Sequence, residues 1–356
     1  MKTNLGAMEL SELEEYFESI GEKKYRARQV FQWIYRGIDS FDEMSDIPAT
    51  LREKLKESAE ISALKVLDCK ISQTDGTRKY LFELPDGNMI ESVFMKYKFG
   101  NSICISSQAG CRMGCVFCAS GKNGLSRNLS AGEMAGQILE VQKNAQEKIN
   151  HIVVMGTGEP FDNYENVSAF MRIVNHEHGL NIGMRNITVS TCGIVPRIKS
   201  FANDFPQANL AVSLHAPNDA MRKKIMPIAN KYPYDELISA CKAYTEKTGR
   251  RITFEYTLIA GQNDDGQYAD ELAAKLQDIL CHVNLIPMNP VSELSLAPSA
   301  REKAVQFMKR LRKKGIATTI RRELGQDIEA ACGQLRLSKF SSLSPCSTQC
   351  EHGIIR

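Results

Sequence analysis

Residues Ser130–Met155 read SAGEMAGQILEVQKNAQEKINHIVVM, which is a helical pattern followed directly by a short apolar run. Ser130 and Glu133 match a capping box, which marks a helix start because each side chain can bond the backbone N–H group of the other. One face of the following helix is apolar at three- and four-residue steps: Met134, Ile138, Val141 and Ala145. The apolar run Ile152–Met155 then predicts a buried strand.

The same alternation of short apolar strands and helices continues from Asn101 onward, which predicts a parallel sheet covered by helices. The predicted strands are Ile103–Ser106, Ile152–Met155, Ile187–Ser190, Leu210–Leu214, Ile252–Leu258, Val283–Ile286 and Ala317–Arg321. These βα units are too few to close a TIM barrel. We therefore predict an α/β fold built on an incomplete (β/α)6-type TIM barrel.

The chain before the barrel has two sequence patterns, one helical and one strand-like. Apolar residues have helical spacing from Met8 to about Ala59, whereas Lys79–Glu83 and Met89–Met95 are strand-like and are bounded by turn signals. A small helical module and a short antiparallel sheet are expected to precede the barrel. The predicted domains are a helical module (1–60) that is a candidate RNA-binding unit, a β linker (61–96), the barrel core (97–335) and a carboxyl-terminal tail (336–356).

Composition limits the class of protein. Lys and Arg number 45 against 42 Asp and Glu among 356 residues, and the net charge of +3 is too mild to identify a nucleic-acid binder. No apolar run approaches the roughly 20 residues of a membrane helix, and no signal peptide is recognised, so we expect a soluble cytoplasmic protein. Its 11 cysteines then indicate metal binding or redox chemistry more than a disulfide framework.

Three of these cysteines follow the first barrel strand in the sequence Cys111-Arg-Met-Gly-Cys115-Val-Phe-Cys118. Thiolates at this spacing can hold three irons of a cubane cluster. The fourth iron then lacks a protein ligand, and the amino and carboxylate groups of S-adenosylmethionine (SAM) can bind it. A structural zinc site is the alternative, but it needs four ligands, and no fourth Cys or His is close in sequence.

Polar residues follow the ends of several predicted strands, where a parallel barrel builds its ligand site. Gly158 allows close backbone approach to a ligand, and Glu159 offers an acceptor for an ammonium group. Each such residue alone is more often a turn or cap residue. Together they predict a pocket rim, made by Gly156-Thr-Gly158-Glu159-Pro160, Ser190-Thr191, Ser213-Leu214-His215 and Pro287-Met288-Asn289.

With these residues in view, the sequence resembles the RlmN/Cfr family of radical SAM RNA methyltransferases over nearly its whole length. The resemblance depends on the cysteine motif and on five further stretches: Cys104-Ile-Ser-Ser-Gln-Ala-Gly-Cys111, Met155-Gly-Thr-Gly-Glu-Pro160, Ser213-Leu-His-Ala-Pro-Asn-Asp219, Asn284-Leu-Ile-Pro287 and Asp327-Ile-Glu-Ala-Ala-Cys-Gly-Gln-Leu335. The cysteine motif alone would indicate only the superfamily.

The resemblance implies roles for individual residues. It implies that Cys111, Cys115 and Cys118 ligate one 4Fe–4S cluster, and that two molecules of SAM are used per turnover. The implied SAM contacts are Gly158, Glu159, Ser190, Ser213, Leu214, His215 and Asn289. Cys332 is implied as the methyl-carrying cysteine, Cys104 as its resolving partner and Glu91 as the proton acceptor. Judged without the resemblance, both cysteines are more simply small buried residues, and Glu91 is a solvent-facing strand residue.

The implied activity is methylation of adenosine carbon-2 in 23S ribosomal RNA and next to the anticodon of some transfer RNAs. An electron donor such as flavodoxin and a monomeric state are expected. Two alternatives stay open: Cfr-type methylation at carbon-8, and a non-catalytic iron–sulfur protein that senses RNA.

Two kinds of basic segment are candidate RNA contacts. Lys23–Arg36 mixes cations with aromatic residues, although Phe31, Ile34 and Tyr35 also have core spacing. The runs Arg222–Lys224 and Lys309–Lys314 are expected on exposed helix faces.

Overall fold

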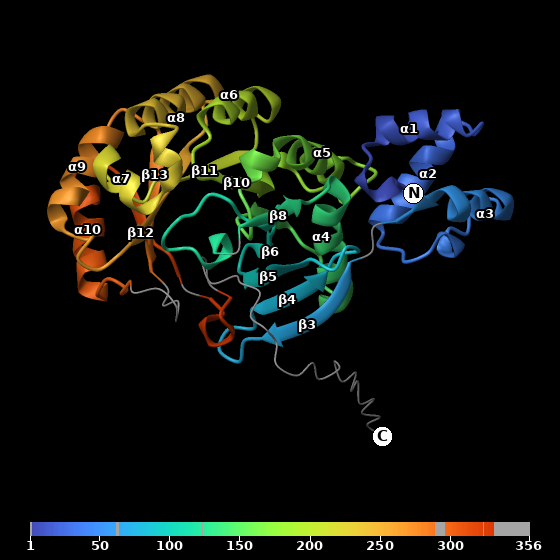
Figure 1. Cartoon of the computed structure of the whole chain (residues 1–356), viewed down its shortest axis with the longest axis horizontal. Coiled ribbons are helices and arrows are strands. Elements are labelled where there is room, and N and C mark those ends of the chain that lie inside the picture. The colour runs from blue at the N-terminus through green and yellow to red at the C-terminus, as the bar shows by residue number, and fades with distance from the viewer. Residues whose placement is uncertain (1, 62–63, 123, 289–295, 323, 331–356) are drawn as a thin grey trace.

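The computed structural model describes residues 2–61, 64–122, 124–288, 296–322 and 324–330. Its amino-terminal part is helical (Figure 1). Its elements are η1 (Leu5–Ala7), α1 (Leu10–Ser19), α2 (Lys24–Tyr35), η2 (Phe41–Glu43) and α3 (Ala49–Ser58). The strands β1 (Thr3–Asn4) and β2 (Ala59–Glu60) pair in parallel and join the two ends of this module. Leu13, Phe17 and Phe31 are fully buried, and the predicted helical pattern is confirmed.

An antiparallel meander follows, made of β3 (Lys65–Ile71), β4 (Arg78–Glu83), β5 (Met89–Tyr97) and β6 (Gly100–Ile105). Gly76 and Gly87 have positive φ angles of 72° and 80° in its first two turns, a conformation that favours glycine. The predicted strands Lys79–Glu83 and Met89–Met95 are confirmed as β4 and β5. The sequence analysis did not single out β3.

Strand β6 also begins the parallel part of the same sheet. Parallel strands follow it in chain order: β9 (His151–Val154), β10 (Ile187–Thr191), β11 (Asn209–Ser213), β12 (Ile252–Leu258), β13 (Cys281–Pro287) and β14 (Ala317–Ile320). Together with the meander they make one ten-stranded sheet with β14 and β3 at its two ends, so within the described residues the barrel is open. Each predicted barrel strand corresponds to an observed strand, and the incomplete barrel is confirmed.

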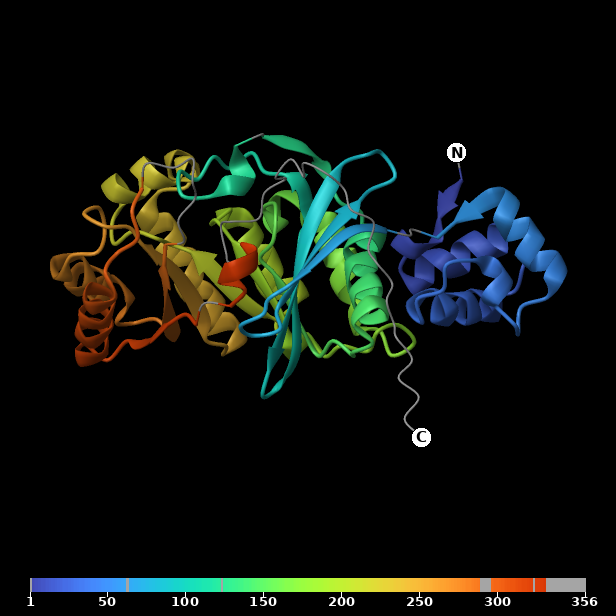
Figure 2. The same cartoon turned by 90° about the horizontal axis from the view of Figure 1, so that it is seen from below.

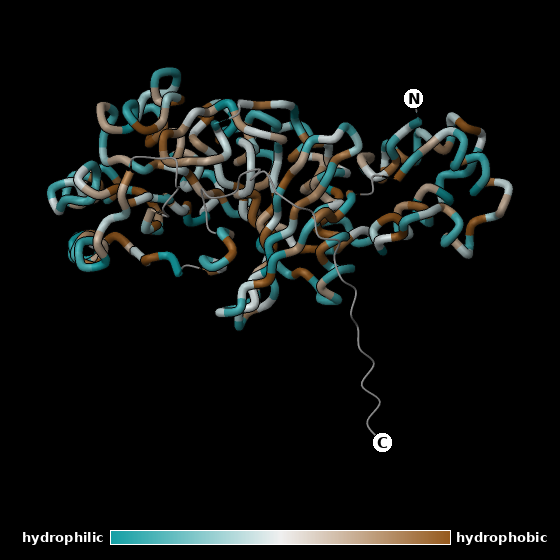
Figure 3. The backbone as a smooth tube through the Cα atoms, turned by 60° about the horizontal axis from the view of Figure 1, so that its bottom comes forward, coloured by the Kyte–Doolittle hydropathy of each residue, from teal (hydrophilic) through white to brown (hydrophobic). Residues whose placement is uncertain are grey.

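Helices connect the parallel strands and cover the outer face of the sheet (Figure 1). They are α4 (Ala131–Ala145), α5 (Tyr164–Asn175), α6 (Val195–Asp204), α7 (Asp219–Ile225), α8 (Tyr234–Thr248), α9 (Gly266–Leu276) and α10 (Arg301–Lys313), with short turns η4 (Pro160–Asn163), η5 (Met184–Asn186) and η6 (Pro227–Asn230). The capping box at Ser130 and Glu133 is present at the start of α4. Apolar segments concentrate along the central strands (Figure 3). No helix in the described ranges has both the length and the apolar character to cross a membrane.

The amino-terminal module packs at one end of the barrel, beside α4 (Figure 2). Gly132 makes this approach possible, because a Cβ there would stand 2.6 Å from the carbonyl oxygen of Gly6. Tyr35 donates a hydrogen bond from its hydroxyl to the same carbonyl at 2.9 Å, and Arg172 on α5 pairs with Glu9 at 2.8 Å. Module and barrel share one continuous apolar core.

A separate two-stranded ribbon lies between β6 and α4. Its strands are β7 (Gln108–Gly110) and β8 (Leu125–Asn128), and η3 (Ala119–Gly121) lies between them. The ribbon was not predicted from the sequence. It matters for the site because the cysteine motif forms the loop that joins its two strands.

Candidate active site

A cavity of about 170 Å³, open to solvent, lies at the carboxyl ends of the parallel strands. Eight of the ten residues predicted as cluster ligands or SAM contacts line it: Cys111, Cys115, Cys118, Gly158, Glu159, Ser190, Ser213 and His215. They come from the ribbon loop and from the ends of β9, β10 and β11. The fold therefore brings together side chains that are far apart in the sequence, at the face where barrels bind ligands.

The cysteine loop is fixed to the barrel through its backbone. Val116 donates its N–H to the carbonyl of Ile225 at the end of α7 (3.0 Å), and Cys118 donates to Cys115 (3.1 Å). Gly114 adopts a φ of 67° in this loop, in the left-handed region that favours glycine. The three thiols are thus presented to the cavity by a loop with defined backbone contacts.

The donor set fits an iron–sulfur cluster. Burial, with the charge of Cys118 as a lesser cause, raises the pKa of the Cys111 thiol to about 11, and burial also raises that of Cys115. Such thiols become thiolates when a cationic metal centre offsets their charge. Among the described side chains, no three His, Cys, Asp or Glu converge on a single ion position. A cubane cluster does not require this, because each thiolate binds a different iron.

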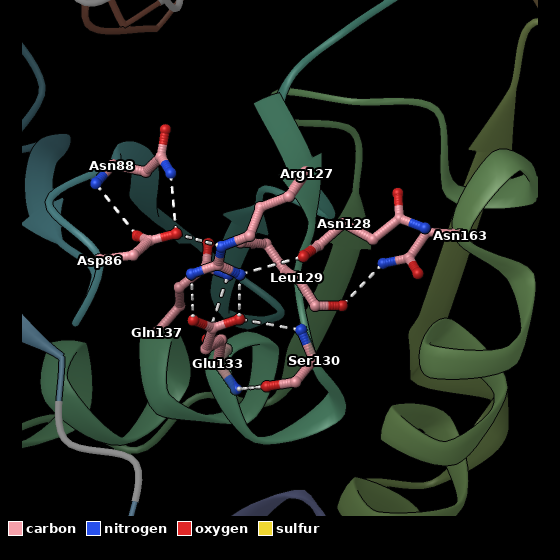
Figure 4. Close-up of polar contacts among 9 residues, drawn as sticks. All are labelled: Asp86, Asn88, Arg127, Asn128, Leu129, Ser130, Glu133, Gln137 and Asn163. Atoms are coloured by element: carbon pink, nitrogen blue, oxygen red, sulfur yellow. Dashed lines mark hydrogen bonds and ion pairs between the residues drawn. The ribbon is translucent and has the colours of Figure 1, made fainter. Parts of the chain in front are cut away.

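The ribbon that carries this loop is braced by Arg127 on β8 (Figure 4). Its guanidinium bonds both oxygens of Glu133, at 2.7 and 2.8 Å, and pairs with Asp86 in the β4–β5 turn. The Arg127 guanidinium holds the pKa of Asp86 well below its usual range. Asn163 donates to the carbonyls of Ser107 and Leu129, both at 2.8 Å. These contacts tie the ribbon to the meander, to α4 and to η4.

Gly158 lies where the backbone after β9 passes the ribbon. Its φ is 110°, and a Cβ there would meet Gln108 Cβ at 2.6 Å. Gln108 accepts the N–H of Glu159 at 2.8 Å and donates to Asn128 at 2.8 Å. Only glycine fits this position, so the glycine-rich stretch is explained by close packing of the site as well as by access for a ligand.

Glu159 is only 4% exposed, and its carboxylate already accepts three hydrogen bonds. The donors are Thr191 Oγ1 (2.7 Å), the Cys192 N–H (2.7 Å) and the Phe161 N–H (3.0 Å). Burial raises the pKa of Glu159, and the hydrogen bonds partly oppose this effect. A carboxylate has about four acceptor positions, so room remains for one further donor such as an ammonium group.

Glu159→Gln is expected to weaken SAM binding about ten- to a hundredfold, because it removes a charged acceptor from a buried contact. The glutamine amide would also direct an N–H group at one of the donors, so the melting temperature should fall. Equilibrium dialysis of labelled SAM with cluster-loaded protein measures the first effect. Glu165→Gln is the control, since that side chain is 79% exposed. Unchanged SAM affinity would remove Glu159 from the binding site.

His215 has a strained backbone and a fixed ring. Its φ is 56°, unusual for a residue with a side chain. The Thr257 N–H donates to Nδ1 at 2.9 Å, and the ring meets Phe117 edge-on at 4.6 Å. Burial, with the charge of Arg222 as a second cause, lowers the pKa of His215 to about 3. At neutral pH the imidazole is therefore uncharged, and Nε2 is its hydrogen-bond donor.

Other predicted residues lie away from the cavity wall. The Leu214 side chain is fully buried in the core, and its N–H bonds the carbonyl of Glu255 at 3.1 Å. Arg222 was expected on an exposed helix face, and this prediction is wrong, because the residue is fully buried and donates to the Cys192 carbonyl at 2.5 Å. Lys223 and Lys224 are exposed as expected. Asn289 lies outside the described residues.

Sequence reasoning missed several residues of the cavity wall, including Cys192, Thr257, Arg321 and Glu255. Glu255 is 5% exposed, and its Oε2 accepts from Asn284 Nδ2 at 2.9 Å. Burial raises its pKa. A signal was available, since Glu255 is a single acidic residue within an otherwise uncharged strand.

Glu91 and Cys104 lie together on the meander rather than in the cavity wall. Glu91 is 2% exposed and pairs with Lys79 Nζ at 2.8 Å, so the solvent-facing alternative is wrong. Cys104 is 6% exposed and clusters with Val93, Met95 and Ala330. Cys332 lies outside the described residues. Ala330, the last described residue, precedes it by two positions.

Comparison with known proteins agrees with this architecture. Two family models match: the ribosomal RNA large subunit methyltransferase N-terminal domain at residues 3–61, and the radical SAM superfamily at residues 105–272. The probable dual-specificity RNA methyltransferase RlmN of Thermoanaerobacter pseudethanolicus is 53% identical over 334 residues, which cover 94% of this chain and 97% of that protein. Its namesake from Clostridium novyi is 52% identical over 328 residues, covering 92% and 96%.

A crystal structure of a radical SAM methyltransferase from Sphaerobacter thermophilus has a TM-score of 0.90 and 46% identity, covering 94% of this chain and 99% of that chain. These matches confirm the predicted family and the incomplete-barrel fold. They also confirm the prediction of a SAM-dependent enzyme with a 4Fe–4S cluster. The chain belongs to the RlmN family of radical SAM RNA methyltransferases.

Proposed function

We propose that this protein methylates carbon-2 of a specific adenosine in 23S ribosomal RNA and of an adenosine beside the anticodon in some transfer RNAs. One observation supports this above the others: the three motif cysteines, Glu159 and His215 line one cavity at the carboxyl ends of the strands. The relatives named above are dual-specificity RNA methyltransferases, which supports two RNA substrates.

In this proposal Cys111, Cys115 and Cys118 hold the cluster. SAM binds against Gly158, Glu159, Ser190, Ser213 and His215 of the cavity wall, beside the backbone of Leu214, and against Asn289. The bound cluster and SAM supply the electron and the deoxyadenosyl radical that remove a hydrogen atom from a methyl group. Neutral His215 and the polar strand ends orient the bound SAM, and the buried positions of Glu159 and His215 keep water from their contacts.

The remaining roles belong to Cys332 and to Glu91 and Cys104, which lie outside the cavity wall. The thiolate of Cys332 takes a methyl group from one SAM, forming an S–C bond and releasing S-adenosylhomocysteine. After the methyl carbon has joined the adenine, the adduct has to lose one electron and one proton; the electron passes to the oxidised cluster, and Glu91 takes the proton that leaves the ring. Cys104 then attacks the sulfur of Cys332, so a disulfide forms while the bond between that sulfur and the transferred carbon breaks. The released carbon takes up a proton to become the methyl group, and a cellular thiol reductant reopens the bridge.

The amino-terminal module supplies a surface for RNA. Phe31, Ile34 and Tyr35 are buried, so the core interpretation of these residues is right. The cations of the same segment remain outside, and Tyr25 is 52% exposed with Arg26 stacked 4.9 Å above its ring. Exposed cations beside an exposed aromatic ring suit phosphate contact and base stacking. We include in the proposal a monomeric cytoplasmic enzyme that receives electrons from a flavodoxin-type donor.

Anaerobic turnover tests the proposal, using cluster-loaded protein, SAM, a reductant and either a ribosomal RNA fragment or transfer RNA. Nucleoside mass spectrometry is expected to detect 2-methyladenosine in both substrates. Finding 8-methyladenosine instead would overturn the carbon-2 assignment. Release of no 5′-deoxyadenosine and no methylated nucleoside would favour the non-catalytic sensor.

A further inference from the structure

We infer that Asp75 and Asp327 form a clamp that holds segment 324–330 on the β3–β4 turn, next to Cys104, and so promotes disulfide exchange between Cys104 and Cys332. This inference rests on the roles proposed above for the two cysteines. It assigns a positioning function to two carboxylates that lie outside the cavity wall.

The clamp consists of reciprocal hydrogen bonds between parts of the chain that are far apart in sequence. Asp327, in η7 (Gln326–Ile328), accepts the N–H of Gln73 at 2.9 Å and the hydroxyl of Thr74 at 3.4 Å. In return, Asp75 accepts the N–H of Gly325 at 2.9 Å. Each side therefore offers a carboxylate to the backbone of the other, which fixes both position and direction.

The conformation and packing of the clamp require glycine at position 325. Gly325 has a φ of 62°, and a Cβ there would stand 2.8 Å from the Ala330 Cβ and 2.9 Å from Thr77 Cγ2. Thr77 is 1% exposed, so it has little freedom to move away. The turn that directs the chain toward Ala330 is thus packed tightly against the start of β4.

The buried side chain of Lys79 attaches segment 324–330 at a third point and also contacts Glu91. Lys79 donates from Nζ to the carbonyl of Glu329 at 3.2 Å while it pairs with Glu91 at 2.8 Å. The side chains of Lys79 and Glu91 are 7% and 2% exposed. The segment that leads to Cys332 is therefore anchored next to the proposed proton acceptor.

The route of the segment supports a positioning role. The strands β14 and β3 are the two ends of the open sheet. Segment 324–330 follows β14 in the chain and reaches the β3–β4 turn at the other end (Figures 1 and 2). There Leu324, Ile328 and Ala330 pack with Val93, Met95 and Cys104. The clamp thus brings the chain to the resolving cysteine just before Cys332.

The test measures how strongly the protein holds its two cysteines together, without turnover. Full-length, cluster-loaded protein is equilibrated anaerobically with defined ratios of oxidised and reduced glutathione. One oxidised glutathione and two protein thiols give a Cys104–Cys332 disulfide and two reduced glutathiones. Mass spectrometry of the linked peptide then gives the effective concentration of one thiol at the other.

Asp327→Ala is expected to lower this effective concentration about tenfold, since it removes two hydrogen bonds to a charged acceptor. Asp327→Asn keeps one acceptor oxygen, so its effective concentration should lie between that of the Asp327→Ala protein and that of the unaltered protein. It provides a second variant if the alanine protein folds poorly. Glu83→Ala is the matched control, because Glu83 pairs with Lys65 on β3 rather than with segment 324–330. It should match the unaltered protein.

An Asp327→Ala protein with an intact cluster and an unchanged effective concentration would overturn the clamp, while the proposed pairing of the cysteines would stand. If the unaltered protein forms no Cys104–Cys332 disulfide at any glutathione ratio, both the clamp and the proposed pairing are wrong. The two failures are therefore distinguishable.

Discussion

Cys118→Ala is expected to abolish the iron–sulfur chromophore and SAM cleavage together. Three thiolates are the protein's whole contribution to the proposed cluster, and two do not retain it. The backbone contacts of the loop do not depend on this side chain, because Cys118 bonds Cys115 through its N–H and Val116 bonds Ile225. Loss of the cluster would therefore report a lost ligand rather than an unfolded loop. Iron and sulfide analysis, with 5′-deoxyadenosine release after reduction, measures both effects.

Cys241→Ala is the matched control for this experiment. Cys241 is a fully buried thiol on α8 that is not part of the cavity wall. Its truncation should cost about 1–3 kcal/mol of stability and leave the chromophore intact. An intact cluster spectrum in the Cys118→Ala protein would show that Cys118 is not a ligand.

The barrel was predictable because buried parallel strands have a simple sequence pattern. Strands covered on both faces are mostly apolar, and Ile152–Met155 and Leu210–Val212 have this composition. The helix at Ser130 was predictable because its capping box is a local interaction. Both signals need only a few neighbouring residues.

The missed elements lack such signals. Strand β3 lies at an edge of the sheet and is half-exposed, so its sequence KVLDCKI has no strict alternation. Strand β8 has the polar sequence LSRN, and it forms because Arg127 is bonded by Glu133 and Asp86. These elements depend on contacts with distant segments.

The residues of the cavity divide in the same way into those that local sequence predicts and those that depend on packing with distant segments. The cysteine motif and the polar strand ends could be identified from spacing alone. The burial of Arg222 within a basic run could not, since only the packed structure shows that its neighbours Lys223 and Lys224 are exposed while it is not. Its burial depends on how α7 is rotated against the barrel.

The sharpest expected contrast is between the two proposed partner cysteines. Cys332→Ala removes the group that receives the methyl, so neither methylated protein nor methylated RNA should form. Cys104→Ala should still load the methyl and join it to RNA, but it lacks the thiolate that attacks the Cys332 sulfur. A covalent protein–RNA adduct should therefore accumulate. It would appear in a denaturing gel as slow-migrating protein that shifts back after ribonuclease treatment.

The fold is expected to tolerate Cys104→Ala. Cys104 is a small side chain, 6% exposed, in a minor apolar cluster with Val93, Met95 and Ala330. Its truncation should destabilise the protein by no more than about 3 kcal/mol. Two purely structural thiols would give no such contrast, because both variants would simply be less stable. Absence of trapped RNA in a Cys104→Ala protein that retains its cluster would exclude the resolving role, because no other step in the proposed sequence releases the base from Cys332.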